Sequence, residues 1–177
     1  WLKSFYNAYT FLKKHSIAVR LMPMTDEQFM LIALQEAKKA LKTKDVPVGA
    51  IIVKDGKIIS KGHNEREKHN DATAHAEIVA IRRANKKLKS WYLDGCVLYV
   101  TMEPCVMCAG AIINSRIDKI VFGASDFRFG CCGTLYNLPE DERFNHRAQV
   151  VSGVLHEQCA KLITDFFKDL REKQSRQ

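Results

Sequence analysis

Residues 96–123 read CVLYVTMEPCVMCAGAIINSRIDKIVFG, and this stretch decides the fold. Its two ends, residues 96–101 and 119–123, are short and mostly apolar, which is typical of strands buried beneath helices. Between them, residues 106–115 begin beside Pro104 and predict a helix. A strand, a helix and a second strand at this spacing predict a parallel crossover.

An antiparallel hairpin is predicted before this unit. Residues 48–53 and 57–60 are strand-like, and Asp55 and Gly56 lie between them. Asp-Gly suits the positive φ angles of a two-residue type I′ turn. Farther along the chain, residues 148–154 alternate as a further strand would.

Three stretches with apolar residues three and four positions apart predict amphipathic helices: residues 25–43, 73–90 and 156–172. Thr25 and Gln28 form a capping box at the start of the first helix. Residues 138–144 predict a helical turn or two. In the last helix we expect five apolar side chains to face the core: Leu162, Ile163, Phe166, Phe167 and Leu170.

Together these elements predict an α/β fold, a three-layer α/β/α sandwich with a mixed sheet of about five strands. We expect one domain over residues 25–177. Residues 1–24 contain four basic residues and no acid before Asp26, so we expect a leader or upstream extension without a functional role. An amphipathic transit sequence is the alternative interpretation of this segment.

The composition narrows the classes of function. The chain has 177 residues, 46% of them hydrophobic, and a net charge of +8. The charge favours an anionic partner such as a nucleic acid, with solubility alone as the alternative. The chain contains no apolar run long enough for a membrane span, so we expect no membrane association. The six cysteines are not spaced as a disulfide framework, and a reducing cytoplasm fits them better.

Two short motifs carry the chemistry. One is His75-Ala76-Glu77 and the other is Pro104-Cys105-Val106-Met107-Cys108. Two thiolates at a helix start and one histidine provide three of the four ligands that zinc prefers, and they balance the charge of Zn²⁺. We therefore predict one catalytic zinc ion per chain, held by His75, Cys105 and Cys108, with the fourth position open for water.

Glu77 is the candidate proton carrier for that water. Residues two apart on a regular helix point in nearly opposite directions, so His75 and Glu77 can share a pocket only at the entrance of the helix. We expect Thr73 to cap the helix there. Two other interpretations stay open: the cysteines could be a redox dithiol, or a structural zinc site could use His63, His69 or His146 as a fourth ligand.

These motifs resemble those of the cytidine deaminase superfamily, whose HxE and PCxxC signature is well known. The similarity is closer to bacterial tRNA-specific adenosine deaminases and covers roughly residues 26–172. Six segments carry it: residues 47–50, 63–64, 100–111, 122–126, 133–134 and 144–147. The resemblance implies hydrolytic deamination of adenosine to inosine at the wobble position of a tRNA anticodon, with zinc-activated water and with Glu77 as the catalytic proton carrier.

The resemblance also implies substrate contacts. Asn64 and Asn145 match positions that bind the target nucleoside, and Asp126 matches one that contacts the neighbouring backbone. Phe167 and Arg171 match positions that meet flanking bases, although a Phe on such a helix is commonly a core residue. The alternative for the other three residues is turn chemistry, because Asn and Asp favour loops.

The resemblance further implies a cytoplasmic homodimer that binds the anticodon stem-loop of tRNA and has no organic cofactor. The chain departs from the family pattern at Met102 and at residues 127–129, Phe-Arg-Phe, which could add a stacking surface for RNA or pack against a partner subunit. Two rival functions are a deaminase of free guanine or cytosine and a non-catalytic zinc or RNA-binding subunit.

Overall fold

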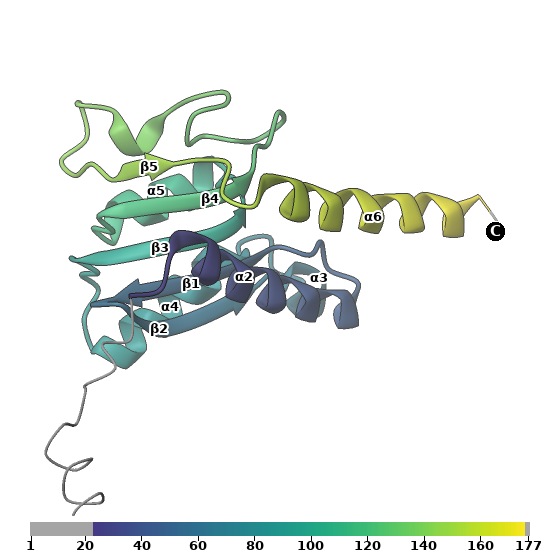
Figure 1. Ribbon diagram of the computed structural model, residues 1–177, viewed down its shortest axis with the longest axis horizontal. Coiled ribbons are helices and arrows are strands. Elements are labelled where there is room, and N and C mark those ends of the chain that lie inside the picture. The colour runs from purple at the N-terminus through teal and green to yellow at the C-terminus, as the bar shows by residue number, and fades with distance from the viewer. Residues whose placement is uncertain (1–22, 176–177) are drawn as a thin grey trace, which may run out of the picture.

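The computed structural model describes residues 23–175, in which five strands form one mixed sheet in the order β2-β1-β3-β4-β5 (Figure 1). β1 (Gly49–Lys54) is antiparallel to its neighbours β2 (Lys57–His63) and β3 (Cys96–Met102). β3, β4 (Lys119–Ala124) and β5 (Gln149–Val151) are parallel to one another. The predicted parallel crossover is therefore confirmed.

Helices cover both faces of the sheet. α2 (Asp26–Ala37) and α6 (His156–Gln174) lie on one face, and α4 (Ala76–Leu88) and α5 (Val106–Asn114) lie on the other (Figure 1). A one-turn helix, α3 (Arg66–His69), follows β2. The predicted three-layer α/β/α sandwich with a five-stranded mixed sheet is confirmed.

Alternate residues of the central strands enter two separate cores, as the two-residue period of a strand requires. Ile52 and Leu98 belong to the core beneath α4 and α5, whereas Ile51 and Tyr99 belong to the core beneath α2 and α6. Because both faces are covered, the strands are apolar throughout rather than alternating.

The local sequence signals are confirmed at two places. Thr25 Oγ1 accepts a hydrogen bond from the backbone of Gln28, whose side chain accepts one from the backbone of Thr25, so the capping box is present. At the hairpin turn, Asp55 and Gly56 have φ angles of 51° and 71°, as a type I′ turn needs.

Several predicted boundaries are wrong. The first helix is α-helical only to Ala37, and residues Lys38–Thr43 (η1) continue it as a tighter 3-10 helix. Of residues 138–144, the first three form a single 3-10 turn, η2 (Leu138–Glu140). Pro139 in this turn supplies no backbone N–H. The last strand is limited to Gln149–Val151 and, among the described residues, pairs on one side alone.

The expected burial of Phe167 and Leu170 is also wrong. Their exposed fractions are 39% and 40%, whereas Ile163, earlier in the same helix, is buried. The reason is geometric, because the second half of α6 extends beyond the sheet (Figure 1). These apolar side chains therefore face solvent in a single chain.

Two other expectations concern the chain as a whole. The predicted leader, residues 1–24, lies outside the described residues except for Pro23 and Met24. Within the described part of the chain, none of the helices has the length and apolar character needed to span a membrane.

Candidate metal centre and substrate cavity

His75, Cys105 and Cys108 come together where α4 and α5 begin. His75 and Cys105 directly precede these helices with extended backbones, and Cys108 lies in the first turn of α5. Nδ1 of His75 is 3.7 Å from Sγ of Cys105 and 3.6 Å from Sγ of Cys108. The three ligand atoms all lie within 4.8 Å of one another.

These separations fit a tetrahedral zinc ion. With Zn–S and Zn–N bonds of about 2.3 and 2.0 Å, tetrahedral geometry places nitrogen and sulfur ligands about 3.6 Å apart. The donor set of two cysteines and one histidine is also one that zinc uses in catalytic sites. The three residues could therefore hold zinc without rearrangement of the backbone.

The histidines considered as a fourth ligand lie elsewhere. Within residues 23–175, the cluster contains no His, Cys, Asp or Glu besides the three side chains above. His63 and His69 contact acidic side chains, and Nε2 of His146 lies 2.8 Å from the backbone oxygen of Ile117. The geometry therefore favours a three-ligand site over a closed structural one.

Without a bound cation, the surroundings of the two cysteine thiols shift their pKa values in opposite directions. Hydrogen bonding from Cys108, together with that from His75, lowers the pKa of Cys105 to about 4 even though burial opposes ionisation. The hydrogen bond to Cys105, together with burial, raises the pKa of Cys108. One thiolate thus forms readily, and a bound cation is needed to hold the second.

Glu77 lies two residues after His75 and is buried, with an exposed fraction of 4%. Burial raises its pKa to about 7, more than the backbone hydrogen bond and the nearby His75 lower it. Glu77 is the second residue of α4, so it shares the helix entrance with His75. This placement is the one that the His-x-Glu spacing requires.

The residue expected to cap this helix is not Thr73. The N-cap position is His75, which makes no side-chain capping hydrogen bond. The backbone N–H and the hydroxyl of Thr73 instead donate to Oδ1 of Asp71, in a turn that precedes the helix. The Thr73 hydroxyl therefore does not cap α4.

A cavity of about 760 Å³ adjoins the cluster and is lined by His75, Glu77 and Cys105. It also brings together four of the five substrate-contact residues predicted from the sequence: Asn64, Asp126, Phe167 and Arg171. These come from the end of β2, the loop after β4 and the exposed half of α6. Residues distant in sequence thus surround one space.

Asn64 offers this cavity an unused acceptor. Its Nδ2 donates to the backbone oxygen of Val46 at 3.3 Å, whereas its buried Oδ1 has no hydrogen-bond partner. An unpaired buried carbonyl oxygen is costly unless a ligand or water completes it. Oδ1 of Asn64 is therefore suited to a ligand that donates a hydrogen bond.

Glu103 organises the loop that forms one wall of the cavity, and the sequence analysis did not identify it. Its buried carboxylate accepts hydrogen bonds from the backbone N–H groups of Asp126, Cys132 and Thr134 at 2.9–3.0 Å, and from the Thr134 hydroxyl. The one available signal was an acid placed directly between a buried strand and Pro104.

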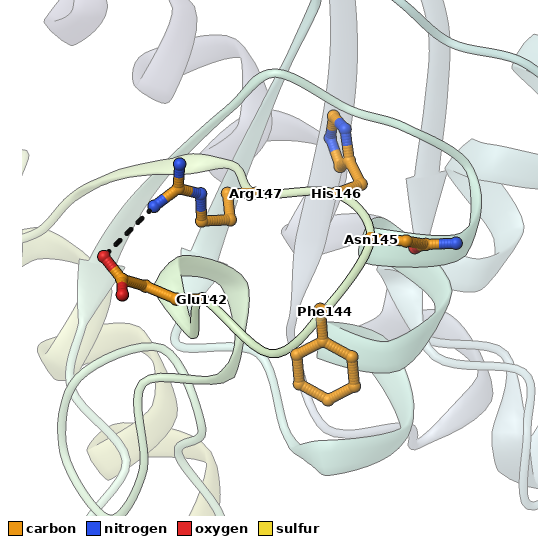
Figure 2. Close-up of a pocket in the computed structure, with 5 residues that line it drawn as sticks. All are labelled: Glu142, Phe144, Asn145, His146 and Arg147. Atoms are coloured by element: carbon orange, nitrogen blue, oxygen red, sulfur yellow. Dashed lines mark hydrogen bonds and ion pairs between the residues drawn. The ribbon is translucent and has the colours of Figure 1, made fainter.

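Asn145 is not brought into this cavity. It lies in a separate open hollow of about 730 Å³ that is also lined by Glu142, Phe144, His146 and Arg147 (Figure 2). Figure 2 shows its side chain directed away from the Glu142–Arg147 ion pair. Its predicted contact with the nucleoside therefore has no geometric basis within a single chain.

Comparison with known proteins gives the family. The family model of MafB19-like deaminases matches residues 24–171. The tRNA-specific adenosine deaminase of Bacillus subtilis (strain 168) is 53% identical over 148 residues, which cover 84% of this chain and 92% of that protein. The chain belongs to the tRNA-specific adenosine deaminase family. Its His-x-Glu and Pro-Cys-x-x-Cys motifs lie within the matched residues.

Solved structures agree on the fold. A structure from work on A-to-I editing by tRNA:A34 deaminases at the wobble position is 40% identical, with a TM-score of 0.73 over 76% of this chain and 97% of that chain. A guanine deaminase from Nitrosomonas europaea is 26% identical, with a TM-score of 0.68 over 80% of this chain and 84% of that chain. The same architecture therefore occurs in proteins named for different substrates.

Replacement of Cys108 by Ala is expected to reduce bound zinc from about one ion per chain to less than about a tenth of that value, because one of the three ligands is lost. Elemental analysis of the purified protein measures the zinc. Cys159→Ala is the matched control, since it removes another buried thiol that lies outside the cluster. Equal zinc content in the two variants would contradict the assignment.

Proposed function

We propose that this protein hydrolyses the exocyclic amine of adenosine at the wobble position of a tRNA anticodon and so produces inosine. The observation that carries the proposal is the buried Glu77 beside the cluster of His75, Cys105 and Cys108, in one cavity. The identity of 53% to a tRNA-specific adenosine deaminase supports the choice of substrate.

The residues of the cluster have separate tasks in this reaction. Zinc held by His75, Cys105 and Cys108 would supply Lewis-acid activation of a water molecule. The Glu77 carboxylate accepts one proton from that water and delivers it to a ring nitrogen, and it then accepts the remaining proton from the added C6 hydroxyl and delivers it to the departing amine. Water adds at C6, the C–N bond breaks and ammonia leaves.

The cavity walls would bind the nucleotide. Oδ1 of Asn64, which has no hydrogen-bond partner within residues 23–175, accepts a hydrogen bond from the target nucleoside. Asp126 contacts the neighbouring backbone, and Phe167 and Arg171 contact the flanking bases. The position of all four residues on one cavity supports these roles.

An RNA substrate fits the charge of the protein and of the cavity. The chain has a net charge of +8, and Arg66, Arg128 and Arg171 line the cavity. Arginine side chains favour phosphates electrostatically and through paired hydrogen bonds. Bases of a single-stranded anticodon loop can leave their stack at low cost, which lets the target base reach a buried glutamate.

We further propose that the protein acts in the cytoplasm as a homodimer and needs no organic cofactor. The tRNA substrate supports the cytoplasmic location. The position of Asn145 bears on the dimer, because this residue lies outside the cavity of its own chain. It could bind the nucleoside only if a second copy brought it to the cavity of the first.

Deamination of a free base is the alternative function. The structural similarity to a guanine deaminase favours it, since the two proteins share a fold. The arginines around the cavity argue against it, because a free base has no phosphate for them to bind.

A comparison of substrates tests the proposed function. The purified protein is expected to convert an anticodon stem-loop with adenosine at the wobble position into the inosine product, and to leave free guanine and free cytosine unchanged. Mass spectrometry of the RNA and assay of released ammonia measure both reactions. Turnover of the free bases without turnover of the stem-loop would overturn the proposal.

Replacement of Glu77 by Ala is expected to lower kcat on the stem-loop at least 10²–10⁴-fold, the range typical of lost general acid–base catalysis. Zinc is expected to stay near one ion per chain, because Glu77 is not a ligand. Glu157→Ala is the control, since it removes an exposed carboxylate that lines neither the cavity nor the hollow of Asn145. Undiminished turnover by Glu77→Ala would instead support a non-catalytic role for this site.

Mixed dimers test the placement of Asn145. Glu77→Ala and Asn145→Ala proteins are each expected to be nearly inactive, whereas equal mixing during refolding should restore about a quarter of wild-type activity, because half of the dimers then contain one intact site. A mixture of Glu77→Ala with Cys108→Ala is the control, because both changes affect the same chain's site. Equal activity of the two mixtures would exclude a contribution of Asn145 across the dimer.

A further inference from the structure

Two phenylalanines stand exposed at the cavity that contains the metal-ligand cluster. Phe127 and Phe129 have exposed fractions of 80% and 64%, and both line the cavity. Exposed aromatic rings gathered at one place indicate a binding surface more often than isolated apolar side chains do. Arg128 lies between them in sequence and lines the same cavity.

The backbone that carries these rings is held in place. Oδ1 of Asp126 accepts hydrogen bonds from the backbone N–H groups of Arg128 at 2.9 Å and Phe129 at 3.2 Å. The N–H of Asp126 is itself bonded to the buried carboxylate of Glu103. The rings are therefore presented from a fixed turn, which lowers the entropy that binding would cost.

Arginines at this surface can pair with the phosphate groups of an occupant. Arg128 and Arg171 bring cationic groups to the cavity, whereas the carboxylates of Glu103 and Asp126 accept hydrogen bonds from the loop backbone. Phe167, with an exposed fraction of 39%, adds a third aromatic ring from α6. Aromatic rings combined with arginines are the features that bind single-stranded nucleic acid, through base stacking and phosphate contacts.

We propose that Phe127 and Phe129 form a stacking surface for the bases that flank the target adenosine, with Arg128 on the adjoining phosphate. This inference rests on the proposed function and adds to it a means of holding the unstacked neighbours. Any base can stack on an aromatic ring, since each base has a π-face. The surface therefore holds the anticodon loop open without sequence specificity.

The test compares the wild type with three variants on one anticodon stem-loop. The double variant Phe127→Ala, Phe129→Ala is expected to raise KM about 5- to 150-fold for each base that loses its stacking partner, while kcat changes less than about threefold. The double variant Phe127→Trp, Phe129→Trp should keep a KM close to that of the wild type. Tyr136→Ala is the matched control, because Tyr136 is 67% exposed on the same loop but does not line the cavity.

Fluorescence gives a readout that does not depend on turnover. A stem-loop with 2-aminopurine next to the target should lose emission when it binds the wild type, because stacking on an aromatic ring quenches this base, and should keep its emission with the double alanine variant. Unchanged KM and equal quenching by that variant would overturn the stacking surface alone. No deamination of the stem-loop by the wild type would overturn the proposed function and the stacking surface together.

Discussion

The site depends on the meeting of two helix N-termini. His75 precedes α4 and Cys105 precedes α5, and the two residues come within ligand distance although 29 residues separate them in the chain. Each helix directs the positive end of its dipole toward the cluster, which favours a thiolate there. This arrangement requires α4 to lie close against the sheet. Gly62 of β2 permits it, because a side chain there would collide with the backbone of Ala76 and Ala80.

Features governed by neighbouring residues could be predicted from the sequence. Asp55 and Gly56 define a turn whose positive φ angles few other residue pairs adopt readily, and Thr25 with Gln28 satisfies helix N–H groups within one turn. The gathering of His75, Cys105 and Cys108 could be predicted for a related reason. A Cys-x-x-Cys at a helix start is a short-range pattern. Two thiolates already balance the charge of Zn²⁺, so a neutral histidine is the expected third ligand.

Features governed by distant contacts could not be predicted in this way. The apolar pattern of α6 is regular to its end, but the sheet beneath it stops, so Phe167 and Leu170 are exposed although the pattern alone indicates burial. The position of Asn145 in a hollow separate from the cavity is likewise set by distant contacts, and its motif does not reveal it. Sequence periodicity reports which side of a helix is apolar but not what covers that side.

Glu103 holds the loop after β4 in place close to the cluster of His75, Cys105 and Cys108. Burial of a carboxylate is unfavourable unless its oxygens are hydrogen-bonded, and here three backbone N–H groups and one hydroxyl satisfy them. Because these donors are mostly backbone groups, the loop can stay anchored whatever side chains its tip carries. Residues 127–129 lie in that loop, beginning three positions after Ala124, the last residue of β4. The Phe-Arg-Phe sequence could therefore change what the cavity binds while Cys105, two residues from Glu103, kept its place beside His75 and Cys108.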